Sequence, residues 1–400
     1  MKYFYLIVFS ILVIEFFLFK SSKKIRKQFP WLISNEDLYP VFKENEFLFF
    51  KKFRFDYNLG WQNKPGYKNF DKIKKRKINY TISKRGFRTK RKNNKKELFA
   101  SFGDSYVFCR QVGNNETWQE QLAKNKSFCI LNYGEGNFGL DQGILKYLNT
   151  KLKKDTKFVI QGFVPETISR IQSEWKHFME FGNLHGFKPR FKLVNGKLIL
   201  KKNPINKNTK IENLSKVIDK IKQSDRFYKE KFSKHTLQFP YILNFLKNFV
   251  FNSKIFLNFY LINFKLFFFK NKINLKDELF EIVVKNNLKI SHNLYNEESS
   301  QNLFLKLIEK FKIIAKKRNH VPILIIFPQL LDLKLEKTAN YFKNFYNNLN
   351  KKIYVINLTD KLYNYDFKKL YVNDRYGGHF SKYGNKIAGK IISKELDKIL

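Results

Sequence analysis

A serine and a histidine, far apart in the sequence, are the residues whose types and neighbours best suit covalent chemistry. Ser105 ends a Gly-Asp-Ser tripeptide that follows a short apolar run, and His379 lies in a glycine-rich loop five residues after Asp374. A serine hydroxyl attacks efficiently once a histidine takes its proton, and an acid can orient that histidine. The three residues therefore predict acyl-transfer chemistry, although a helix N-cap would by itself explain Ser105 equally well.

The remaining candidates for chemistry have less support in the sequence. Two cysteines are too few for a disulfide scaffold or a multi-cysteine zinc cluster, and we expect Cys109 and Cys129 to be free thiols. The other five histidines have no glycine-rich turn with a nearby acid before them: His177, His185, His235, His292 and His320. No metal site is predicted.

Short apolar runs that could position Ser105 and His379 recur along the chain. Runs of five to seven apolar residues are typical of buried parallel strands, and helical periodicity separates them here. A helix with one apolar face is predicted over residues 303–315. The sequence therefore predicts an α/β fold with a doubly wound parallel sheet, and Ser105 would follow its first strand, where such sheets bind ligands. The predicted strands are residues 98–102, 127–133, 158–164, 322–327 and 352–358.

The third and fourth predicted strands are separated by a large insertion, which we place at residues 169–300. Residues 190–200 predict a hairpin around Asn195 and Gly196, a dipeptide suited to a type I′ turn, and residues 211–223 predict a helix. Residues 241–269 are rich in Phe, Leu and Ile but contain three lysines. This segment could be an aromatic lid, a helix on a membrane surface or, less favourably, a second membrane span.

The N-terminus predicts a membrane anchor. Residues 3–19 are almost wholly apolar, interrupted by Glu15, and lysines follow them; no small-residue cleavage site is evident. We divide the chain into an anchor with its basic flank (1–28), a juxtamembrane extension (29–96), an α/β domain (97–168 and 301–400) and the insertion. The positive-inside rule alone would place the body in the cytoplasm, but lysine abounds throughout this chain, so the side of the membrane stays open.

The net charge of +44 is compatible with a partner that is nucleic acid or an anionic membrane. Only 12 of the 78 basic residues are arginine, however, and the excess is spread along a chain that is also rich in Phe, Ile and Asn. Nucleic-acid recognition favours arginine's planar fork. Codon bias explains this composition better, and we do not expect a nucleic-acid partner.

Three segments together resemble the SGNH/GDSL hydrolase superfamily. They are the block around Ser105 (residues 102–112), a second block at residues 132–142 and the late segment 378–381. Within that superfamily the chain is similar to membrane-anchored bacterial members associated with polysaccharide and cell-surface modification. These share features such as Leu-Gly-Trp at 59–61, Lys-Pro-Gly at 64–66 and Gly-Phe-Arg at 86–88.

The resemblance implies a flavodoxin-like sheet and ester hydrolysis or acyl transfer without a metal or organic cofactor. It makes Ser105 the nucleophile, His379 the base and Asp374 the orienting acid of a triad. The oxyanion hole would combine the backbone amide of Ser105 with that of Gly136 or Asn137.

The sequence departs from the superfamily pattern at three places. The acid usually lies three residues before the histidine, where this chain has Tyr376, and the second block usually has glycine where Asn137 stands. The third block usually supplies an asparagine side chain to the oxyanion, but residues 162–167 read Gly-Phe-Val-Pro-Glu-Thr. Thr167 is the candidate that replaces it.

We therefore expect a single-pass membrane protein that is a serine esterase or O-acyltransferase. Its substrate would be an acylated carbohydrate, such as a cell-surface polysaccharide, or another ester, and an extracytoplasmic, periplasmic location is favoured over the cytoplasm. The alternative is a non-catalytic glycan-binding or scaffold protein that keeps the fold, which the missing asparagine favours. A basic membrane-surface or nucleic-acid binder is a further alternative that only the charge supports.

Overall fold

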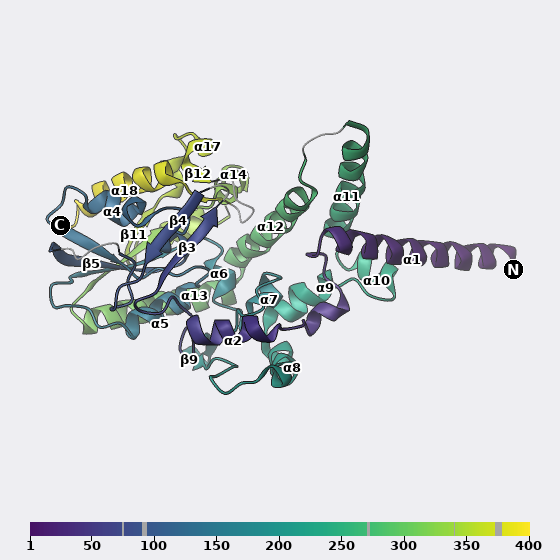
Figure 1. The fold of residues 1–400 in the computed structure, drawn as a ribbon, viewed down its shortest axis with the longest axis horizontal. Coiled ribbons are helices and arrows are strands. Elements are labelled where there is room, and N and C mark those ends of the chain that lie inside the picture. Colours follow the sequence, from purple (N-terminus) through teal and green to yellow (C-terminus); the bar gives the residue numbers. More distant parts are fainter. Residues whose placement is uncertain (74–75, 90–93, 270–272, 340, 373–377) are drawn as a thin grey trace. The chain divides into compact units, whose positions relative to one another are not determined.

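The computed structural model describes all residues except 74–75, 90–93, 270–272, 340 and 373–377 (Figure 1). The chain forms two compact units. The first contains residues Met1–Phe47, Ser173–Phe187 and Asn208–Asn287, and the second contains Leu48–Gln172, Lys188–Lys207 and Leu288–Leu400. Of the extension that we expected at residues 29–96, the part from residue 48 onward is grouped with the α/β unit, and so is the hairpin of the insertion.

A five-stranded parallel sheet forms the centre of the second unit. In spatial order its strands are β11 (Tyr354–Asn357), β10 (Val321–Ile326), β7 (Phe158–Phe163), β5 (Lys96–Gly103) and β6 (Phe128–Asn132). Numbered along the chain, this is the order 2-1-3-4-5 of flavodoxin-like sheets, in which ligands bind where the winding reverses. That switch point lies between β5 and β7. The predicted fold class is confirmed.

Helices cover both faces of the sheet (Figure 1). Helices α4 (Trp118–Ala123) and α18 (Lys382–Leu396) pack together on one face, while α5 (Leu140–Leu148) and α13 (Glu298–Lys317) pack on the other. Since the strands alternate their side chains between the faces, each strand supplies apolar residues to both layers. The largest described core cluster includes Phe99, Trp118, Ile160, Ile325 and Ile392.

Two glycines allow β5 and β7 to end in close contact. Gly103 pairs with Gly162, and its φ of +143° is rarely adopted by residues with a side chain. A Cβ atom on Gly103 would lie 1.8 Å from the Gly162 carbonyl oxygen, which no Cβ can tolerate. Glycine at position 103 therefore lets the chain turn sharply before Ser105.

The predicted hairpin forms as β8 (Arg190–Val194) and β9 (Lys197–Lys201). Both turn residues, Asn195 and Gly196, have positive φ, as a type I′ turn requires. The predicted helix after the hairpin corresponds to α8 (Leu214–Ser224).

The first unit contains α1 (Lys2–Gln28), whose apolar side chains from Tyr3 to Phe17 are largely exposed. Among the described helices, α1 alone is long and apolar enough to cross a membrane. This is consistent with a single-pass anchor or a signal sequence. Residues 241–269 form two helices, α10 (Tyr241–Leu246) and α11 (Phe249–Phe269).

Replacing Gly103 by alanine should destabilise the fold strongly, because the new Cβ would meet the β7 backbone. We expect a loss of at least about 2 kcal/mol in the free energy of unfolding, and a clear fall in Tm by differential scanning calorimetry. The matched control is Gly136→Ala, since no atom lies within 4 Å of a Cβ built there. Equal Tm values for the two variants would contradict the predicted close approach of β5 and β7.

Candidate active site

Ser105 lies at the carboxyl edge of the sheet, directly after the turn that ends β5. It begins the short helix α3 (Ser105–Phe108), and Asp104 caps this helix by accepting a hydrogen bond of 2.9 Å from the Tyr106 amide. The Ser105 side chain is not the helix cap, so its hydroxyl is available for another contact.

His379 supplies that contact. It lies on β13 (His379–Phe380), which pairs with β12 (Tyr371–Val372), and its Nε2 is 2.9 Å from Ser105 Oγ. The two residues are 274 positions apart in the sequence. The structure therefore brings the candidate nucleophile and the candidate base within hydrogen-bond distance, the spacing that direct proton transfer needs.

Tyr106 holds the histidine loop against the nucleophile. Its ring stacks on the imidazole of His379 with centroids 5.1 Å apart, and its buried hydroxyl donates a hydrogen bond to the Gly378 carbonyl. Gly378 has a φ of +84°. Tyr106 is not predictable as a site residue, because an aromatic residue after the serine carries no sequence signal for such a contact.

The third member of the predicted triad, Asp374, lies outside the described residues, and so does Tyr376, the residue at the usual spacing. The role of Asp374 as the orienting acid stays a prediction.

The second block forms a loop that is fastened to the end of β5. The Glu135 amide donates a hydrogen bond of 2.9 Å to the Gly103 carbonyl, and a Cβ on Gly134 would lie 2.2 Å from the Phe108 amide nitrogen. Asn137 adopts a left-handed φ of +65°, a conformation that asparagine tolerates better than most residues. The candidate oxyanion amides of Gly136 and Asn137 thus lie on a loop with a defined conformation.

Residues 59–63, which precede both blocks in the sequence, form hydrogen bonds to this loop. The Trp61 indole donates to the Gly136 carbonyl at 2.9 Å, and the Asn63 side chain donates to Glu135 at 2.8 Å. Glu135 also pairs with Lys146 at 2.7 Å, and both side chains are buried. The Leu-Gly-Trp motif therefore binds the backbone of the loop that follows β6.

Arg88 of the Gly-Phe-Arg motif binds the backbone segment that follows the nucleophile in the sequence. Its buried guanidinium donates to the carbonyls of Phe108 (2.6 Å), Cys109 (2.8 Å) and Val112 (2.5 Å). Phe108 and Cys109 lie where α3 ends, and a cation near the carbonyls of a helix C-terminus is favourable. Arg88 thus stabilises the segment that carries Ser105.

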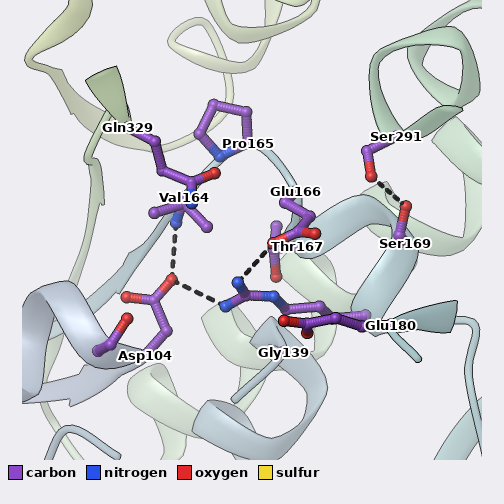
Figure 2. Close-up of polar contacts among 12 residues, drawn as sticks. Asp104, Gly139, Val164, Pro165, Glu166, Thr167, Ser169, Glu180, Ser291 and Gln329 are labelled. Carbon is purple, nitrogen blue, oxygen red and sulfur yellow. Dashed lines mark hydrogen bonds and ion pairs between the residues drawn. The ribbon is translucent and has the colours of Figure 1, made fainter. Parts of the chain in front are cut away.

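The carboxylate of Asp104, the residue before the nucleophile, is almost fully buried. It accepts hydrogen bonds from the amides of Tyr106 and Val164, both at 2.9 Å, and contacts Arg170 at 3.5 Å. Burial raises the pKa of Asp104, while Arg170 and the two amides oppose that rise. Arg170 also binds Glu166 at 2.6 Å, so one guanidinium joins the segments after β5 and β7 (Figure 2).

Two side chains at this edge are candidates for the missing oxyanion donor. Thr167 is fully buried, and its Oγ1 accepts a hydrogen bond of 2.8 Å from the Leu140 amide at the start of α5. Gln329, three residues after β10, is buried at the same edge of the sheet (Figure 2). No sequence signal marks Gln329, since the superfamily pattern places the side-chain amide after the third strand and Gln329 follows the fourth.

Two of the remaining histidines have side-chain partners of their own, and both cysteines are buried. His292 Nε2 lies 2.8 Å from Asp332 in a fully buried pair, and His320 Nδ1 lies 2.7 Å from the Tyr147 hydroxyl. Cys109 and Cys129 are free and buried, and burial raises their pKa values to about 12 and about 11. Within the described part of the chain, no cluster of three His, Cys, Asp or Glu residues could hold a metal ion.

Comparisons with known proteins add little to this geometry. No family model matches the chain, and no curated protein matches it. Among solved structures, the chain is similar to one from Desulfitobacterium hafniense that is provisionally described as a lipolytic protein of the G-D-S-L family. The likeness covers 75% of this chain and 99% of that chain at 10% identity, with a TM-score of 0.34.

Proposed function

We propose that this protein is a serine esterase or O-acyltransferase that acts on ester-linked acyl groups. The observation that carries the proposal is the 2.9 Å contact between Ser105 Oγ and His379 Nε2 at the switch point of the sheet. The pair is partly buried, and it lies at the edge where open α/β sheets bind ligands.

In the proposed mechanism, Ser105 attacks the ester carbonyl while His379 takes the hydroxyl proton. The oxyanion that forms accepts hydrogen bonds from the backbone amides of Ser105 and of Gly136 or Asn137. His379 then gives the proton to the leaving alcohol, and an acyl-enzyme on Ser105 remains. Water or a sugar hydroxyl resolves the acyl-enzyme by the reverse proton path, and Asp374 would orient the imidazole throughout.

The proposed substrate is an acylated carbohydrate, with a cell-surface polysaccharide as the favoured class. The support is the resemblance of the motifs at 59–66 and 86–88, together with the apolar helix α1, which would hold the enzyme at a membrane. An extracytoplasmic active site follows from such a substrate. We propose no nucleic-acid partner.

A non-catalytic glycan-binding protein is the second candidate function. It is favoured by the absence of an asparagine in the segment that follows β7. An oxyanion donor typically contributes about 3 kcal/mol to transition-state stabilisation, so the lack of a replacement would leave little turnover.

Ser105→Ala should abolish labelling by a fluorophosphonate probe, because the probe forms its covalent bond with an activated serine. The assay is gel fluorescence of the purified full chain after reaction with the probe. Ser381→Ala is the matched control: this serine lies two residues after His379 and caps α18 through the Gly384 amide, so labelling should persist. Equal labelling of wild type and Ser105→Ala would refute the nucleophile.

His379→Ala should lower the hydrolysis of a short activated acyl ester by at least about 10³-fold, as Ser105→Ala should. Residues that act as one catalytic unit are non-additive, so we expect the double variant to be within about tenfold of either single variant. Turnover of p-nitrophenyl acetate measures all three variants. A wild type without turnover on acetyl, longer acyl and sugar-linked esters would favour the glycan-binding function instead.

Replacement of the side-chain oxyanion donor should lower kcat by about 10²- to 10³-fold with little change in KM, because the contact forms in the transition state. Thr167→Val and Gln329→Ala test the two candidates, and Tm values identify any loss of folding. A loss confined to one variant would name the donor. Unchanged kcat in both folded variants would mean that neither side chain stabilises the oxyanion.

A further inference from the structure

An apolar stripe along α11 is exposed although the opposite face of the helix is buried. Phe251, Ile255, Phe259 and Ile262 pack inside the first unit. Val250, Leu257, Leu261, Phe264 and Phe268 are all more than half exposed. Their spacings of seven, four, three and four residues place them on one line along the helix. A helix that is apolar all round is expected inside a protein core or a membrane, and no described residue covers this stripe.

The charges on α10 and α11 are all positive. Lys254 follows Val250 by four residues and Lys265 follows Leu261 by four, so both lie along one side of the stripe and are exposed. Lys247 follows α10, and neither helix contains an acidic residue. Lysine stems can lie on apolar surface while their ammonium groups reach anionic head groups.

Helix α10 is attached to α1 close to the end of the apolar stretch of α1. The Glu15 carboxylate accepts hydrogen bonds from the amides of Tyr241 and Ile242, the latter at 2.8 Å. Tyr241 also packs against Phe19, with ring centroids 5.5 Å apart. Glu15, the acid that interrupts the apolar stretch, therefore caps α10, whose exposed residues include Leu243 and Leu246.

Helix α11 crosses α1 near the position where α10 contacts α1 (Figure 1). Tyr260, in the middle of α11, stacks on Phe17, donates a hydrogen bond of 2.7 Å to Ser21 and lies beneath the Lys24 ammonium. If α1 spans the bilayer, residues 15–24 lie where the acyl chains meet the head groups, since the apolar stretch ends at Phe19 and lysines follow. Since α11 runs across α1 rather than along it in Figure 1, a position of α11 along the membrane surface follows if α1 spans the bilayer.

We propose that α10 and α11 form a second membrane contact, which lies in the interface of an anionic bilayer and holds the first unit at a fixed depth. The stripe of α11 faces the acyl chains, and its lysines bind lipid phosphates. The proposal depends on α1 for its membrane and is independent of the esterase chemistry, since no residue of the candidate active site takes part.

The test measures the depth of α11 in lipid with single-cysteine variants of the full chain. Leu257→Cys and Leu261→Cys carry an environment-sensitive fluorophore, as do Ile11→Cys in α1 and Ile199→Cys on the exposed β9 strand. The native thiols are buried and have raised pKa values, so reagents should reach the introduced cysteines preferentially. The protein is reconstituted into vesicles of phosphatidylcholine and phosphatidylglycerol that contain nitroxide-labelled lipids.

We expect the α11 labels to be quenched at least about twofold more by nitroxide near the head group than by nitroxide near the acyl-chain end. The Ile11 label should show the opposite preference, and the Ile199 label should not be quenched. Phosphatidylglycerol should increase the quenching of the α11 labels relative to vesicles of phosphatidylcholine alone. The double variant Lys254→Glu/Lys265→Glu should lose this increase, while Lys197→Glu on β9 should keep it.

Unquenched α11 labels, with Ile11 quenched, would overturn the proposal and leave the anchor in place. Deep quenching of the α11 labels would also overturn it, because α11 would then span the membrane. Shielded α11 labels that crosslink between copies would overturn it in favour of a protein contact. Fluorophosphonate labelling of Ser105 in the same vesicles reports separately on the esterase.

Discussion

The buried carboxylate of Asp104 is the interaction on which the geometry of the candidate active site depends. Placing a carboxylate in the interior costs several kcal/mol unless hydrogen bonds and a cation compensate for the lost water. Here the compensation comes from the amides of Tyr106 and Val164 and from Arg170. These groups belong to the segments after β5 and β7, so satisfying one charge aligns both segments. The neighbouring Ser105 is positioned as a consequence, and the Gly103–Gly162 contact supplies the close approach that makes this possible.

The segment before the first strand of the sheet completes this arrangement. Arg88 binds the carbonyls where α3 ends, and Trp61 and Asn63 bind the loop that carries the candidate oxyanion amides. Each contact uses a backbone group or a buried ion at the edge that carries Ser105, and none involves Ser105 or His379 directly. Trp61, Asn63 and Arg88 therefore help to position the candidate active site.

Glu15 has an analogous role in the first unit. A carboxylate in an apolar helix is costly in lipid, and the N-terminal amides of α10 are costly when they have no hydrogen-bond acceptor. The Glu15 carboxylate and the N-terminal amides of α10 pair with each other. The acid that makes α1 less favourable in lipid therefore holds the apolar helix α10 beside α1. Charge satisfaction thus determines which segments lie together in both units.

Local patterns predicted the strands of the sheet and the chemical types of the residues at the site. Continuous apolar runs predicted five buried strands, because a parallel strand covered on both faces has no polar side. The Asn195–Gly196 dipeptide predicted its turn, because few other residues adopt positive φ twice in succession. Ser105 and His379 were also recognisable, because each follows a predicted strand in a glycine-rich setting.

Only the tertiary structure decided which of these residues meet. The 2.9 Å contact of Ser105 with His379 depends on a sheet order that brings together residues 274 positions apart. The motifs that contain Arg88 and Glu135 do not show which groups these side chains bind. Nothing local distinguishes Arg170 from the many exposed charges of this chain, since burial and partners come from packing. The partner of Glu15 likewise lies 226 positions away. Periodicity and turn chemistry act over a few residues and can be read from sequence, whereas the satisfaction of buried charges requires distant segments to pack and becomes visible only in the fold.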